Sequence, residues 1–134
     1  MGMLNNALFM QYCLEAGRIL IGLYFFSFFF WNYYHRVPAI EGMRASHVPF
    51  APVIFGFGIC FQLVIGLLVV FAQFTEICAA LLVIYVICAT FIFHRFWTME
   101  EGAPRTLNTI IFIGNLTVTL GGLLLLIGLS AAVH

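Results

Sequence analysis

The side chains best suited to proton transfer lie where a long apolar segment ends, in the stretch 91–97. This stretch reads Phe-Ile-Phe-His-Arg-Phe-Trp, so that His94 and Arg95 stand among aromatic residues. An imidazole titrates near neutral pH and can therefore give or take a proton. We take His94 and Arg95 as the candidate catalytic pair. The simpler interpretation, a histidine at a helix end in the membrane interface, stays open.

Three of the four histidines fall near the ends of apolar segments that we place on one face of a membrane: His35, His47 and His94. Imidazole nitrogens suit zinc, iron and copper. The three residues come from different elements, however, and no two of them show the His-x-x-x-His spacing of a metal site. They are weak metal candidates, and ordinary interfacial histidines are the favoured interpretation.

Polar residues also occur inside the apolar segments. Gln62 lies between Gly58 and Gly66 at intervals of four, a spacing that lets another helix approach closely and hydrogen-bond to the amide. The plainer role of such residues is helix packing. The sharper hypothesis is a small polar cavity for a quinone head group or a lipid. Its candidate residues are Gln62, Thr90, His94, Asn115 and Thr119.

One positive charge lies apart from the others, near the start of the first apolar segment. Glu15 and Arg18 are three residues apart and share a helix face, so they can form an ion pair. Glu76, at the start of the third segment, is expected at the same membrane depth as Arg18. We predict an ion pair of Arg18 with Glu15 or Glu76, because a charge at membrane depth costs about 2.5–3.5 kcal/mol.

Two of the four cysteines, Cys13 and Cys78, stand at helix starts on the same side of the membrane. If that side faces an oxidising space, the two thiols could form a disulfide. Buried, unreactive thiols are the alternative, since equal depth does not bring two Cα atoms within bonding range.

The composition determines the setting of all these residues. The 134-residue chain is 64% hydrophobic and 7% charged, with a mean hydropathy of +1.13, whereas soluble domains carry roughly 25% charged residues. We predict an all-α, polytopic membrane protein that forms one domain over 1–134, with four transmembrane helices in an antiparallel bundle. A net charge of zero argues against nucleic-acid binding. The predicted helices span about 13–34, 51–73, 75–97 and 106–129.

Arginines indicate the orientation in the membrane. Four of the five border the first and third connections, and only Arg18 lies toward the other side. Cytoplasmic loops carry the excess of basic residues. We therefore expect the loops 35–49 and 98–105 in the cytoplasm and both termini outside.

Several stretches resemble the DoxX-like family of small four-helix bacterial membrane proteins. They are the Arg-x-x-x-Gly stretch from Arg18 to Gly22, the Val-Pro-Phe-Ala-Pro entry at 48–52, the Ala-Thr-x-x-Phe-His-x-Phe-Trp ending at 89–97, and the fourth segment with Asn115 and two glycines at 121–122. One departure is Gln62, where the family often has glutamate. The resemblance implies a four-helix bundle in the bacterial cytoplasmic membrane.

Relatives in that family are linked to membrane redox complexes and to quinone chemistry, so the resemblance implies a redox setting. The favoured hypothesis is an accessory or docking subunit without catalytic activity of its own. Alternatives are a quinone-linked oxidoreductase that uses His94 and Arg95, and a transporter or binding protein for small solutes or lipids. The expected partners are membrane lipids, other membrane subunits or a redox partner protein, and a second copy of the chain.

Overall fold

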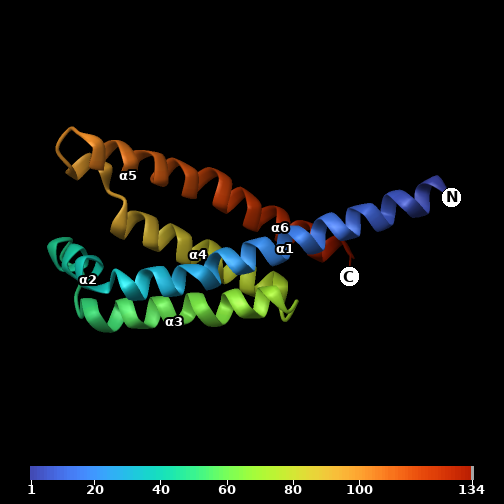
Figure 1. Ribbon diagram of the computed structural model, residues 1–134, viewed down its shortest axis with the longest axis horizontal. Coiled ribbons are helices and arrows are strands. Elements are labelled where there is room, and N and C mark those ends of the chain that lie inside the picture. Colours follow the sequence, from blue (N-terminus) through green and yellow to red (C-terminus); the bar gives the residue numbers. More distant parts are fainter. Residues whose placement is uncertain (134) are drawn as a thin grey trace.

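A computed structural model describes residues 1–133 of the protein, and within them the fold is all-helical. Four helical stretches are long and apolar enough to cross a membrane, as predicted. Figure 1 shows them as two antiparallel pairs, α1 with α3 and α4 with the stretch α5–α6. The elements are α1 (Gly2–Tyr34), α2 (Arg36–Ala45), α3 (Ala51–Val70), α4 (Thr75–Phe93), a 3₁₀ turn η1 (Phe96–Thr98), α5 (Ala103–Gly114), a π-helical segment η2 (Asn115–Thr119) and α6 (Leu120–Val133).

Two elements differ from the prediction by more than the three or four residues by which the ends of the other spans differ. The expected loop 35–49 contains α2, a helix too short and too polar to stand out in a hydropathy pattern. The first helix begins at Gly2 rather than near residue 13 and has 33 residues, which gives a length of about 50 Å. Its N-terminal part extends beyond the other helices (Figure 1). Asn5, Asn6 and Gln11 lower the hydropathy there, but no proline interrupts the helix.

Helices α1 and α3 touch backbone to backbone at two glycines. A Cβ atom built on Gly22 would lie 2.8 Å from the Gly66 carbonyl oxygen, and one built on Gly66 would lie 2.8 Å from the Phe26 amide nitrogen. Neither position has room for a side chain. The close approach expected near Gln62 therefore occurs at Gly66, whereas Gly58 faces the Tyr85 ring with ordinary spacing.

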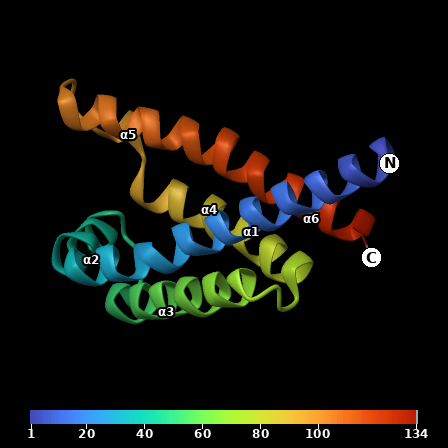
Figure 2. The same ribbon diagram turned by 45° about the vertical axis from the view of Figure 1, so that its right-hand side comes forward.

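The best-packed core lies beside this crossing, toward the end of the bundle that holds the α3–α4 turn. Val69, Leu82 and Leu123 are almost fully buried there, and they join α3, α4 and α6. A second cluster, around Met43 and Phe55, holds α2 against α3. The fourth span, made of α5, η2 and α6, moves away from α3 toward the end of the bundle that holds α2. Figures 1 and 2 both show this separation. The bundle is therefore tight at one end and open at the other.

The Arg18 side chain caps the C-terminal end of α3. Its guanidinium donates hydrogen bonds to the carbonyl oxygens of Val69 and Val70 and pairs with Glu15, and the residue is only 7% exposed. Glu15 is thus the ion-pair partner, and over residues 1–133 no ion pair joins Arg18 to Glu76. The last carbonyls of a helix have no partner within it. Arg18 supplies one from the neighbouring helix.

The disulfide considered between Cys13 and Cys78 is not formed. Both residues are free cysteines, Cys13 exposed and Cys78 buried. The Cys78 thiol instead lies 3.5 Å from the Gln73 carbonyl oxygen and donates to it. Equal depth in the membrane did not bring the two side chains together.

Candidate functional site: a cavity inside the bundle

Where the fourth span diverges, a partly open cavity of about 950 Å³ lies between α1, α3, α4 and η2, with α2 and α5 at its edges. Its wall is mostly aromatic and aliphatic and includes Tyr24, Phe28, Trp31 and Phe61. The cavity is only partly enclosed, and its lining residues Val118, Phe57 and Trp31 are 78%, 74% and 60% exposed. Cavities of roughly 300–1,000 Å³ with a few polar groups in an apolar wall are typical of small-molecule sites.

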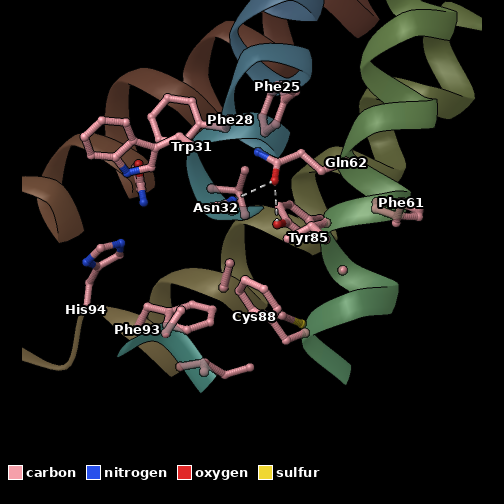
Figure 3. A pocket seen from close by; sticks show the side chains of 18 of the residues that line it. Phe25, Phe28, Trp31, Asn32, Phe61, Gln62, Tyr85, Cys88, Phe93 and His94 are labelled. Carbon is pink, nitrogen blue, oxygen red and sulfur yellow. Dashed lines mark hydrogen bonds between the residues drawn. The ribbon is translucent and has the colours of Figure 1, made fainter. Parts of the chain in front are cut away.

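The largest polar group in this wall centres on Gln62. Asn32 Nδ2 and the Tyr85 hydroxyl both donate to Gln62 Oε1, each at 3.1 Å. Figure 3 shows these three side chains, from three helices, meeting at one point of the wall. Gln62 is 4% exposed, and its Nε2 makes no hydrogen bond within residues 1–133.

A second polar contact involves the π-helical segment. Asn115 Nδ2 donates to Thr90 Oγ1 at 3.0 Å, which ties η2 to α4. Asn115 and Thr119 line the cavity, whereas Thr90 is fully buried behind Asn115 and does not reach it. Short π segments inside longer helices are frequent at functional sites.

His94 lines the cavity at the end of α4. Its Nδ1 lies 2.8 Å from Asn108 Oδ1, and Asn108 Nδ2 donates to the Pro104 carbonyl oxygen at 2.9 Å. Because the Asn108 amide nitrogen is already engaged, its oxygen faces the imidazole, so His94 Nδ1 carries the proton. In the neutral ring, Nε2 is then the free acceptor.

Arg95 does not share this space with His94. It lines a separate, smaller pocket of about 120 Å³ together with Ser46 and Thr98. Adjacent residues at the end of a helix point in different directions, and here one faces the cavity and the other the junction of α2 with η1. The structure therefore separates the His94–Arg95 pair that the sequence suggested.

The three candidate metal ligands are not brought together. His35 lines the cavity and donates from Nδ1 to the Trp31 carbonyl oxygen at 2.9 Å. His47 lies outside the cavity wall, in the connection between α2 and α3. Among residues 1–133 no three His, Cys, Asp or Glu side chains lie close enough to hold a metal ion.

Asn32 and Tyr85 are cavity residues that the sequence did not single out. Asn32 stands within the aromatic run 28–34, and Tyr85 is one aromatic residue among many, so neither stands out in the sequence. The signal that points to them is Gln62 itself, because a buried amide requires partners on the helices that face it.

Comparison with known proteins identifies a family whose model matches the part of the chain that contains most of the cavity residues. No curated protein and no solved structure matches the chain. The DoxX family model matches residues 13–95. The matched range contains Asn32, Gln62 and Tyr85 as well as His94, while Asn108 and Asn115 of the fourth span lie beyond it. Since the match covers more than half of the sequence, the chain belongs to the DoxX family of membrane proteins.

Proposed function

We propose that this DoxX-family protein binds a quinone, or a similar flat and lipid-soluble molecule, and serves as an accessory membrane subunit for a redox partner. The observation that carries the proposal is the cavity of about 950 Å³. Its aromatic wall suits a planar ring, and its few polar groups suit ring oxygens. Its partly open wall provides a route from the membrane.

The polar groups of the cavity suit binding better than passage. Gln62, Asn115 and Thr119 all face this one space. Beyond it, toward the α3–α4 turn, the bundle is filled by the apolar cluster that contains Val69, Leu82 and Leu123. A polar solute would have no partners along that part of a path. A bound molecule therefore enters and leaves by the same end, which supports a binding role over transport.

The accessory role rests on the charge distribution. Arg36 and Arg44 lie on α2, Arg95 directly precedes η1, and Arg105 lies in the first turn of α5. Figure 1 shows these elements at the same end of the molecule, which is also the end with the cavity. Glu41, Glu100 and Glu101 stand at the same end, so this surface carries charges of both signs that a complementary partner surface could pair with. A redox partner docked there would stand next to a bound quinone.

Quinone binding is tested with the two tryptophans as matched reporters. Trp31 lines the cavity, whereas Trp97 belongs to an aromatic cluster with Phe91 and Phe112 outside the wall. With W97F protein in lipid nanodiscs, a short-tailed benzoquinone is expected to quench Trp31 fluorescence and to saturate at roughly micromolar concentration. With W31F protein, quenching of Trp97 should rise linearly with quinone. Equal, unsaturated quenching of both reporters would contradict the proposal.

The bacterial inner membrane, with both termini outside, is part of the same proposal, and it rests on the four arginines of the α2–α5 end. Alkaline phosphatase folds to its active form only outside the cytoplasm. Fused after the last residue or at Gln73, in the α3–α4 turn, it is expected to be active. Fused at Gly102 it is expected to be inactive. The opposite pattern in cells would place the cavity mouth on the outer face.

A further inference from the structure

The Gln62 amide has a fixed orientation. Its oxygen accepts two hydrogen bonds, from Asn32 on α1 and from Tyr85 on α4, each at 3.1 Å. The Tyr85 hydroxyl and the Asn32 amide group both act as donors here, so they hold the oxygen and leave the amide nitrogen free. In Figure 3 the Gln62 nitrogen points away from Tyr85, toward the side of the cavity where Phe25 and Phe28 lie.

Gln62 Nε2 is a hydrogen-bond donor without an acceptor, on a side chain that is almost fully buried. Gln62 is 96% buried, as its exposed fraction is 4%, and Nε2 has no acceptor among the described residues. Among the described residues, Arg18 Nε is a polar atom that is fully enclosed and has no hydrogen-bond partner. Gln62 Nε2 also has no partner, but it is not fully enclosed. Nε2 therefore borders the cavity space. A buried donor without an acceptor costs free energy that a bound acceptor recovers.

We propose that Gln62 Nε2 is the donor for a carbonyl oxygen of the bound molecule, and that Asn32 and Tyr85 are positioning residues that keep it in this orientation. This inference rests on the proposed function. It adds that the Gln62 end of the cavity favours the oxidised form of the ligand, the quinone, over the quinol. An amide NH₂ offers donors only. A quinone carbonyl is a good acceptor, whereas a quinol hydroxyl is a poorer one and needs an acceptor for its own proton.

The inference separates the roles of the two sides of the cavity. Gln62 presents a donor, while His94 and His35 line the same cavity with their Nδ1 atoms engaged by Asn108 and by the Trp31 carbonyl oxygen, which leaves Nε2 as the ring atom available to a ligand. An imidazole Nε2 can accept from a quinol hydroxyl or donate to a quinone carbonyl, according to where its proton lies, so the overall preference between quinone and quinol depends on both sides. The contribution of Gln62 is therefore measured as a change in that preference and not as its absolute value.

The quantity to measure is the dissociation constant of the quinol divided by that of the quinone, which we call the selectivity ratio. Anaerobic calorimetry on intact protein in nanodiscs, with a short-tailed benzoquinone and its reduced form, gives both constants. Gln62→Met, which keeps the volume and removes the amide, is expected to lower the ratio about fivefold to tenfold. A tenfold loss would raise the midpoint potential of the bound two-electron couple by about 30 mV.

Tyr85→Phe tests the positioning role without removing the donor. The Gln62 amide then keeps only Asn32 and can turn its oxygen to the cavity, so the ratio is expected to fall about threefold or more. Tyr12→Phe is the matched control. Tyr12 is 71% exposed and is not among the residues that line the cavity, so the selectivity ratio of this variant should equal that of the wild type.

A spectroscopic signature separates positioning from general damage to the cavity. With ¹³C-labelled quinone carbonyls, the infrared stretching band of the bound wild-type complex is expected at lower frequency than in an apolar solvent, and it should shift back in Gln62→Met. If both ligand forms bind but the selectivity ratio is unchanged in both variants, this inference is wrong and the proposed function stands. A rise in the ratio would mean that the amide oxygen faces the ligand. If neither form binds the wild type, the proposed function fails as well.

Discussion

Replacing Gly22 by alanine is expected to lower the free energy of unfolding by about 2 kcal/mol, because the new methyl group would overlap the backbone of α3. The built Cβ lies 2.8 Å from both the Gly66 carbonyl oxygen and the Val70 amide nitrogen. Backbone atoms cannot rotate away as a side chain can, so the two helices must separate. Thermal or detergent-induced unfolding followed by circular dichroism measures the effect.

Gly17→Ala is the control in the same helix. A Cβ at Gly17 meets nothing within 4 Å, and alanine favours a helix over glycine by about 1 kcal/mol. Gly17→Ala is therefore expected to be neutral or stabilising, so only Gly22→Ala is expected to lower the free energy of unfolding. An equally stable Gly22→Ala protein would show that α1 and α3 are not held in contact at this crossing.

The same contact sets the geometry of the cavity. Gly22 and Gly66 fix how α1 lies against α3, and Asn32 reaches Gln62 across that pair of helices. A shift of α1 would move the Asn32 amide away from Gln62. Gly22→Ala should therefore also weaken quinone binding, although glycine has no side chain that could touch a ligand.

Hydropathy predicted the spans because each is a long run of apolar residues, a property visible without knowing the neighbours of any residue. It missed α2, since a short, polar helix lacks that signal, and it placed the start of α1 too late, since Asn5 and Asn6 resemble the end of a span. Those two residues lie in a helix that continues past its neighbours, where polar side chains need not be buried.

The candidate site was predicted in part for a similar reason. Gln62, Asn115 and His94 are polar groups in or at the end of apolar spans, so they stand out one by one, and all three line the cavity. Their partners were not predicted, because the Asn32–Gln62 and His94–Asn108 contacts depend on how each helix is rotated about its axis. Spacing along the chain gives the depth of a residue in the membrane but not the rotation of its helix. For the same reason the sequence could not decide whether Arg18 pairs with Glu15 or with Glu76.

Replacing Arg18 by alanine is expected to lower the free energy of unfolding by about 3 kcal/mol, close to the cost of breaking a buried charged network. The change leaves the carbonyl oxygens of Val69 and Val70 without their partner at the end of α3. Val69 is fully buried, so water cannot readily replace the guanidinium. Arg36→Ala is the matched control. Arg36 is exposed and rests on the Tyr33 ring, and its loss should cost less than about 0.5 kcal/mol.

Two further substitutions decide which contact of Arg18 matters. The Glu15 side chain is 46% exposed, so its pairing with Arg18 is screened and should contribute less than about 1 kcal/mol. Glu15→Ala is therefore expected to be nearly as stable as the wild type. Arg18→Lys keeps the charge but replaces the planar fork by a single ammonium group, which cannot hold two carbonyls in the same geometry. It should recover only part of the loss, whereas full recovery would mean that charge alone, without the bonds to α3, stabilises this end of the bundle.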